Sequence, residues 1–200
     1  MIIHKELEQG SEEWLQVRLG KITASTFHTL LGNSQTKNTL LYKIASERLT
    51  GVRCDQDTFR NHHIDRGHEL EDEAIALYEV QQDVEVERVG FVELNEFLGC
   101  SPDGLVDNGG VEIKSPDNHT YLMAVSKQYI KPEYRTQCHV NMYVTDAKWW
   151  DYVMYNVNFD NPIHVIRLYR DEAEIEKIKA CVAECEAKIA KIINDFNKSN

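Results

Sequence analysis

The chain has 200 residues, of which 42% are hydrophobic and 28% charged, and its formal net charge is −11. These proportions exclude a disordered or fibrous protein and predict one compact domain over residues 1–200. The acidic balance argues weakly against a nucleic-acid partner, because Lys and Arg contacts to phosphate usually dominate such binding, yet net charge does not report where the charges lie.

The start of the chain and its cysteines point to a reducing compartment. Charged residues stand where a signal peptide needs an apolar core, and no segment approaches the roughly 20 apolar residues of a membrane span. The five cysteines are odd in number and lack a CxxC pair, which argues against a disulfide framework or a zinc site. We therefore expect a cytoplasmic protein with no membrane partner.

Helical signals dominate the first part of the chain. Ser11 can cap a short helix that stops at Gly20, and a second helix is expected from Ser25 to Gly32. Further helices are predicted over residues 39–49 and 65–80, the latter with one apolar and one acidic face.

The central part of the chain has the composition of strands. Short β-branched and aromatic runs lie within residues 84–94, 97–100, 105–106 and 111–113, separated by Pro-Asp-Gly and Asn-Gly-Gly turns, and they predict an antiparallel meander. A helix over residues 132–144 and strands around 149–157 and 163–168 follow. Together these elements predict an α/β fold with a central sheet flanked by helices.

The last segment repeats apolar residues at alternating spacings of three and four. Over residues 171–197 this pattern predicts a long helix with an apolar seam. The seam can pack against the core of its own domain or against a neighbouring subunit.

The segment Ser101–Lys114 carries the clearest chemistry. A Pro-Asp-Gly turn delivers the carboxylate of Asp103, and Glu112 and Lys114 alternate on the next strand, so both leave the same face. Carboxylates of this kind suit Mg²⁺ or Mn²⁺, and a neighbouring ammonium can orient or deprotonate the water that attacks a phosphodiester. The alternative is an ordinary hairpin with exposed charges.

This segment resembles the PD-(D/E)XK nuclease motif, and the chain resembles the lambda-exonuclease and YqaJ-type viral recombinase family. Trp14-x-x-x-Arg18 with Thr23-Ala24-Ser25 is similar to the family's N-terminal signature, which implies that Arg18 and Ser25 hold a DNA 5′-phosphate. Two further segments, Gly67-x-x-x-Glu71 and Tyr134-x-x-Gln137, resemble family motifs. They imply that Glu71 joins the metal site and that Gln137 contributes to catalysis.

The resemblance implies a restriction-endonuclease-like core with a mixed sheet. The implied metal ligands are Asp103, Glu112, Glu71 and the backbone carbonyl of Ile113, holding Mg²⁺, with Mn²⁺ as a substitute and two ions in each site. From the residues alone, Glu69, Asp72 and Glu73 compete with Glu71 for this role. His62, His63 and His68 are not needed as ligands, and Ser115-Pro116 departs from the family's pattern.

The activity implied is 5′→3′ resection of linear double-stranded DNA to 3′ single-stranded tails, with release of mononucleotides. The family also implies a homotrimeric ring, a single-strand annealing protein as partner, and a bacterial or phage-infected host cell. Two alternatives share most of these residues: a nuclease that cuts internally, and a DNA-end-binding recombination scaffold without catalysis.

Overall fold

In a computed structural model of the chain, which describes residues 1–32, 35–54 and 62–199, the strands form two four-stranded sheets. The first sheet has the order β1-β3-β4-β2, in which only the β2–β4 pair is parallel: β1 (Ile2–His4), β2 (Ile22–Thr23), β3 (Phe91–Glu93) and β4 (Leu98–Cys100). The second has the order β5-β6-β7-β8 and is mixed, with β6 and β7 parallel: β5 (Gly104–Val106), β6 (Gly109–Lys114), β7 (Trp149–Tyr155) and β8 (Ile163–Tyr169).

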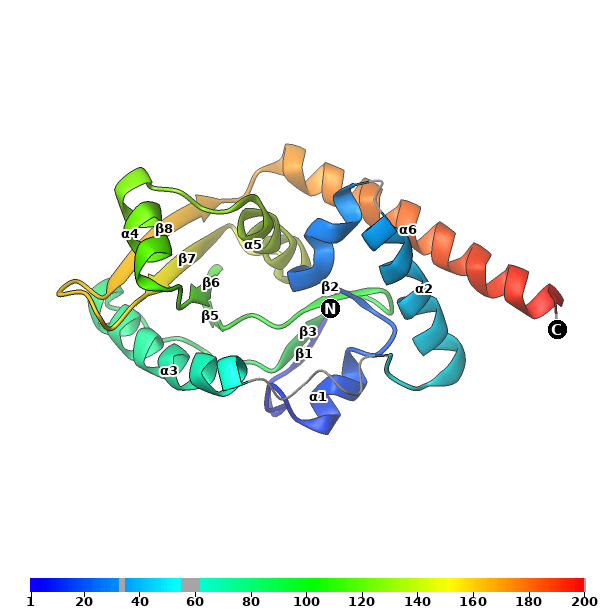
Figure 1. Ribbon diagram of the computed structural model, residues 1–200, viewed down its shortest axis with the longest axis horizontal. Helices are drawn as coiled ribbons and strands as arrows, with labels where there is room; N and C mark the ends of the chain where they lie inside the picture. Colours follow the sequence, from blue (N-terminus) through cyan, green and yellow to red (C-terminus); the bar gives the residue numbers. More distant parts are fainter. Residues whose placement is uncertain (33–34, 55–61, 200) are drawn as a thin grey trace.

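Helices lie around these sheets (Figure 1). In chain order they are α1 (Glu12–Val17), the 3-10 helix η1 (Ala24–Leu31), α2 (Gln35–Thr50), α3 (His62–Gln82), α4 (Asn118–Lys127), α5 (Pro132–Thr145) and α6 (Glu172–Ser199). Ser11 caps α1 by accepting a hydrogen bond from the Trp14 amide, as its sequence position predicts. None of the helices in the described part of the chain is long and apolar enough to cross a bilayer.

The second sheet is covered by helices on both faces. Alternate residues of β6 and β7, such as Ile113 and Val153, pack against α3. The intervening residues of β7, such as Trp150 and Tyr152, pack against α4 and α5 on the other face, and Figure 1 shows the same arrangement. The predicted central mixed sheet flanked by helices is therefore confirmed.

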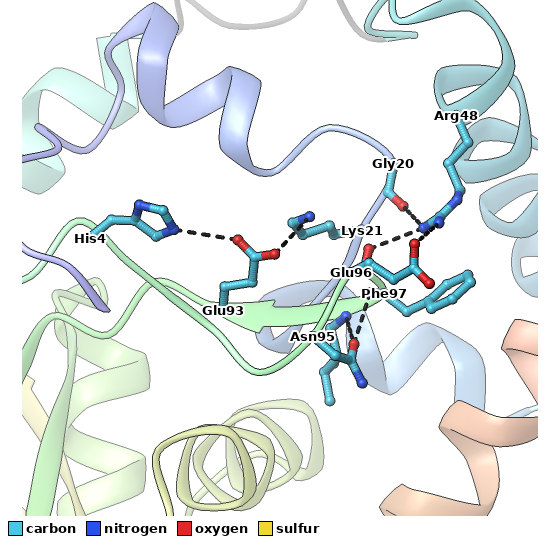
Figure 2. A network of polar contacts seen from close by, with 9 residues as sticks. His4, Gly20, Lys21, Arg48, Glu93, Asn95, Glu96 and Phe97 are labelled. Carbon is cyan, nitrogen blue, oxygen red and sulfur yellow. Dashed lines mark hydrogen bonds and ion pairs between the residues drawn. The ribbon is translucent and has the colours of Figure 1, made fainter. Parts of the chain in front are cut away.

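A polar network ties the first sheet to α2 (Figure 2). The guanidinium of Arg48 donates to the backbone carbonyls of Gly20 and Glu96 at 3.2 and 3.1 Å and to the Glu96 carboxylate at 3.0 Å. Glu93 lies between His4 and Lys21, each with a nitrogen 3.4 Å from a carboxylate oxygen. These contacts fix the segment that follows α1, which carries the Thr23-Ala24-Ser25 sequence.

The apolar seam of α6 is buried within its own chain. Ile175, Ile178, Val182, Cys185 and Ile189 belong to one core cluster with residues of η1 and α2. Figure 1 shows α6 running alongside α2, with its C-terminal end extending beyond the other elements. Phe196, near that end, is 55% exposed.

Several elements differ from the sequence predictions. The meander is interrupted, because β4 and β5 belong to different sheets, and residues 84–89 contribute only an isolated bridge between Glu87 and Leu105. Strands β1 and β2 and helix α4 were not predicted. α4 is short and is capped by Asp117, whose side chain accepts a hydrogen bond from the Thr120 amide. Its apolar residues span too few turns to give a clear helical pattern in the sequence.

The five cysteines, all of which lie in described residues, are free thiols, and Cys54 alone among them is exposed. This agrees with the absence of a disulfide framework that their number and spacing predict.

Candidate active site

Asp103 is held against β6 by a backbone hydrogen bond. The turn before β5 places its Oδ2 atom 2.6 Å from the amide nitrogen of Ile113, which donates to it. The antiparallel register pairs Gly104 with Val111, so the Asp103 turn necessarily lies beside residues 112–114. The carboxylate of Asp103 thus lies near enough to Glu112 and Lys114 for its charge to shift the pKa values of both.

Glu112 is the centre of the hydrogen-bond network and is only 1% exposed. Its Oε1 atom accepts from the Lys114 ammonium and, at 2.7 Å, from Gln137 Nε2. Its Oε2 atom accepts from Asn141 Nδ2 at 3.2 Å. Gln137 and Asn141 lie one turn apart on α5, so this helix presents two amide donors to one buried carboxylate.

Burial and neighbouring charge perturb the pKa values of Glu112, Glu71 and Lys114, three side chains on which the charge of Asp103 acts. Burial raises the pKa of Glu112 to about 7, although Lys114 lowers it, and Asp103 raises it further. Burial and Asp103 likewise raise the pKa of Glu71 to about 7 against the opposing charges of Arg88 and Lys114. Burial would lower the pKa of Lys114, but the carboxylates of Glu112 and Asp103 outweigh it and raise that pKa.

The acidic side chains of α3 contact different partners. Glu71 accepts from Arg88 Nη2 at 2.8 Å, and the charges of Asp103 and Lys114 both act on it. Asp72 is an exposed side chain, 3.4 Å from Arg88 Nη1, and Glu73 accepts from the Tyr155 hydroxyl at 2.8 Å on the α3 side of the sheet. The side chains of Glu69, His62, His63 and His68 lie outside the described residues.

The carboxylates of Asp103, Glu71 and Glu112 suit a divalent cation, although they do not form a preformed coordination site. Within the described residues, no three His, Cys, Asp or Glu side chains are arranged as a metal site. Burial and, beside it, the charge of Asp103 nevertheless raise the pKa of both Glu71 and Glu112, so negative charge is concentrated around Asp103. A cation bound there would relieve that repulsion, and hard oxygen ligands suit Mg²⁺ or Mn²⁺. The backbone of Ile113, between Glu112 and Lys114, borders the same place.

Arg18 is hydrogen-bonded to the segment that leads into Asp103. Its Nη1 atom donates to Ser101 Oγ at 2.8 Å, and its guanidinium lies 3.9 Å above the Trp14 ring. Burial lowers the pKa of Arg18 to about 10, so it keeps its positive charge at neutral pH. Ser25 is exposed at the start of η1, with Oγ 3.4 Å from Thr23 Oγ1.

Sequence reasoning missed three residues that organise the site. Asn141 could have been found from its spacing of four after Gln137, which places both on one helical face. Ser101 and Arg88 could not, because they reach Arg18 and Glu71 only through tertiary packing.

Comparisons with known proteins agree with this fold. The model of the YqaJ-like viral recombinase domain matches residues 13–148. No curated protein matched the sequence. Among solved structures, an alkaline exonuclease (LHK-Exo) from Laribacter hongkongensis is 31% identical, with a TM-score of 0.87 over 94% of this chain and 97% of that one.

A second structure of LHK-Exo, in complex with dAMP, is 33% identical over 95% of this chain and 100% of that one, with a TM-score of 0.83. A phage-related exonuclease from Haemophilus somnus 129PT is 18% identical, with a TM-score of 0.67 over 88% of this chain and 96% of that one, and supports the fold alone. The α/β, restriction-endonuclease-like fold class predicted from the sequence is confirmed by these matches.

Proposed function

Because the chain belongs to the YqaJ-like viral recombinase family, we propose that it is a metal-dependent exodeoxyribonuclease that resects linear double-stranded DNA. It degrades one strand in the 5′→3′ direction into mononucleotides and leaves a 3′ single-stranded tail. The observation that carries the proposal is the buried Glu112 carboxylate, which lies beside Asp103 and accepts hydrogen bonds from Lys114 and Gln137. The similarity to the alkaline exonuclease LHK-Exo supports the same activity.

The metal ligands in this proposal are Asp103, Glu112, Glu71 and the carbonyl of Ile113. Two Mg²⁺ ions bound at this place, with Mn²⁺ as a substitute, would supply positive charge that stabilises phosphodiester hydrolysis and would acidify a nearby water. The raised pKa values of Glu71 and Glu112 support these ligands, because a bound cation would stabilise the ionised form of carboxylates that burial and the charge of Asp103 disfavour.

Lys114 acts in this proposal as a cationic hydrogen-bond donor. Its raised pKa keeps the ammonium protonated at neutral pH, which favours orienting the attacking water or stabilising the phosphate over removing a proton. Gln137 holds one oxygen of Glu112 and presents its amide beside Lys114. It is therefore assigned the role of aligning Glu112 and the scissile phosphate.

Arg18 and Ser25 are assigned to the 5′-phosphate of the DNA end. Anchoring of Arg18 to Ser101, two residues before Asp103, supports this role, because a terminal phosphate bound there lies close to the cleavage centre. An arginine fork suits a phosphate group, and Ser25 lies in the first turn of η1, where backbone N–H groups favour anions.

The remaining parts of the proposal concern the domain, the number of subunits, the location and the protein partner. Residues 1–200 form one nuclease domain with α6 packed on its core, and three copies form a ring around DNA in the cytoplasm. The burial of the α6 seam within its own chain directs the ring contacts to other surfaces. A single-strand annealing protein receives the 3′ tail. Light scattering of the purified protein measures the number of subunits directly.

The decisive experiment is release of acid-soluble label from linear duplex DNA labelled separately at its 5′ and 3′ ends. Reactions contain Mg²⁺ or EDTA, and the ends carry either a 5′-phosphate or a 5′-hydroxyl. Lys114→Ala is compared with Lys191→Ala, which removes an exposed lysine of α6 far along the chain from the site.

We expect early release of the 5′ label with Mg²⁺, no release with EDTA or with Lys114→Ala, and normal release with Lys191→Ala. Internal fragments would instead identify a nuclease that cuts within the duplex. Binding of DNA ends without any cleavage would identify a scaffold, and full activity of Lys114→Ala would refute the assigned catalytic centre.

A further inference from the structure

A small pocket opens directly beside Lys114 on the α5 side of the second sheet. Its volume is about 120 Å³, well below the roughly 300–1,000 Å³ of pockets for drug-sized ligands. Its walls come from the end of β6, from α4 and the turn after it, from α5 and from β7. The side chains that matter for its chemistry are Lys114, Met123, Tyr129, Lys131, Tyr134 and Tyr152.

The inner wall of the pocket is aromatic with positive charge around it. The rings of Tyr134 and Tyr152 are stacked, with centroids 5.7 Å apart and planes inclined by 23°. The ammonium groups of Lys114 and Lys131 lie 5.4 and 5.6 Å from the Tyr134 ring centroid. A ligand in this pocket therefore meets a flat π-surface and, at its edge, two cations.

The mouth of the pocket is open and apolar. Met123 and Tyr129 are each 42% exposed, although both side chains are large and hydrophobic in character. Both lie at or just after α4, the helix that borders Lys114 across the Ser115-Pro116 turn. Because these exposed apolar side chains lie next to a proposed reaction centre, we expect a part of the substrate to cover them.

The size and chemistry of the pocket select that occupant. A single planar ring system attached to an anionic group matches an aromatic wall flanked by two ammonium groups. In DNA this combination is a base together with its own phosphate. Because the pocket includes Lys114, a base held there belongs to the nucleotide whose phosphodiester is at the cleavage centre.

We propose that the Tyr134–Tyr152 pocket receives the base of the terminal nucleotide, unpaired from the duplex, while its phosphodiester lies at Lys114. This inference rests on the proposed function and names a positioning element for it. Removing a nucleotide from a duplex end requires unstacking its base, and the pocket offers a second stacking partner in return. Every base has a π-face, so such a pocket can accept any of the four bases.

The test measures binding of two ligands that differ only by the base. Thymidine 5′-monophosphate and 2-deoxyribose 5-phosphate are titrated calorimetrically into the wild-type protein in Mg²⁺. Stacking of one base on aromatic side chains strengthens binding by roughly 5- to 150-fold, which corresponds to about 1–3 kcal/mol. We expect the nucleotide to bind more tightly by a factor in that range.

Variants then assign the difference to the pocket. Tyr134→Leu and, independently, Tyr129→Ser should reduce the preference for the nucleotide, the former to less than about twofold on loss of the stacking surface. Tyr134→Phe keeps the ring and should retain it. Tyr42→Leu, at a tyrosine of α2 that is 63% exposed, is the matched control and should behave like wild type.

Equal affinity of the two ligands for the wild type would overturn the inference, and so would a preference that survives in both Tyr134→Leu and Tyr129→Ser. Hydrolysis of duplex DNA is measured on the same preparations. If the wild type cuts DNA but binds the two ligands with equal affinity, the base-binding role of the pocket is refuted and the proposed function stands. A wild type that does not cut DNA refutes the function, and the titrations still decide separately whether the pocket binds a base.

Discussion

Binding of the divalent cation should weaken strongly between pH 8 and pH 6. Glu71 and Glu112 both have pKa values of about 7, raised in each case first by burial. A carboxylate must lose its proton to ligate a metal, so protons compete with the cation below pH 7. Both groups are mostly ionised at pH 8 and mostly protonated at pH 6.

The size of the effect follows from these values. For one group with a pKa of 7, proton competition weakens the apparent affinity by a factor of about 1.1 at pH 8 and about 11 at pH 6, a tenfold change. If both carboxylates must be ionised, the change is about 100-fold, or about 2.7 kcal/mol.

The assay is calorimetric titration of Mn²⁺ into the protein without DNA, at pH 6 and pH 8 and at constant ionic strength. Glu71→Gln removes one of the two titrating groups, so its affinity should change only about tenfold over the same interval. Glu176→Gln alters an exposed carboxylate of α6 and should retain the full effect.

Equal Mn²⁺ affinity at the two pH values would refute the reasoning, because it would mean that neither buried carboxylate ligates the ion in its ionised form. An unchanged pH dependence in Glu71→Gln would remove Glu71 from the ligand set while leaving Glu112 in place.

Three further predictions concern other contacts. Gln137→Ala and Asn141→Ala each remove an amide donor to Glu112, and we expect DNA hydrolysis to fall roughly 10- to 100-fold with the folded state preserved by circular dichroism; rates within twofold of wild type would contradict this role. Arg18→Lys keeps the charge but loses the fork, so the preference for 5′-phosphorylated over 5′-hydroxyl ends, measured in competition, should fall roughly tenfold or more; an unaltered preference would remove Arg18 from end recognition. Asp151 is fully buried and accepts hydrogen bonds from Arg167 Nε and Nη2, each at 2.8 Å, and from the Tyr78 hydroxyl. Arg167→Met removes the two arginine donors and leaves only the Tyr78 hydroxyl of the three. We therefore expect the free energy of unfolding, measured in urea, to fall by roughly 2–4 kcal/mol. A loss below about 0.5 kcal/mol would show that the pair contributes little, as exposed pairs do.

The sequence predicted those features of the site that lie on one continuous hairpin. Asp103 follows a turn signal, and Glu112 and Lys114 are two residues apart on a strand, so the alternation of side chains puts them on one face. The long apolar period of α6 likewise identified a helix with a buried seam, since its spacing depends only on helical geometry.

Tertiary structure alone decided which distant residues join that hairpin. From the sequence of α3, the residues Glu69, Glu71, Asp72 and Glu73 were equal candidates for the metal site. Only the packing of α3 against β6 brings Glu71 under the charges of Asp103 and Lys114. The same holds for Asn141 beside Glu112 and for the pocket formed by α4, α5 and β7. Local periodicity fixes the direction of a side chain relative to its own element, whereas the partners that it meets depend on how separate elements pack.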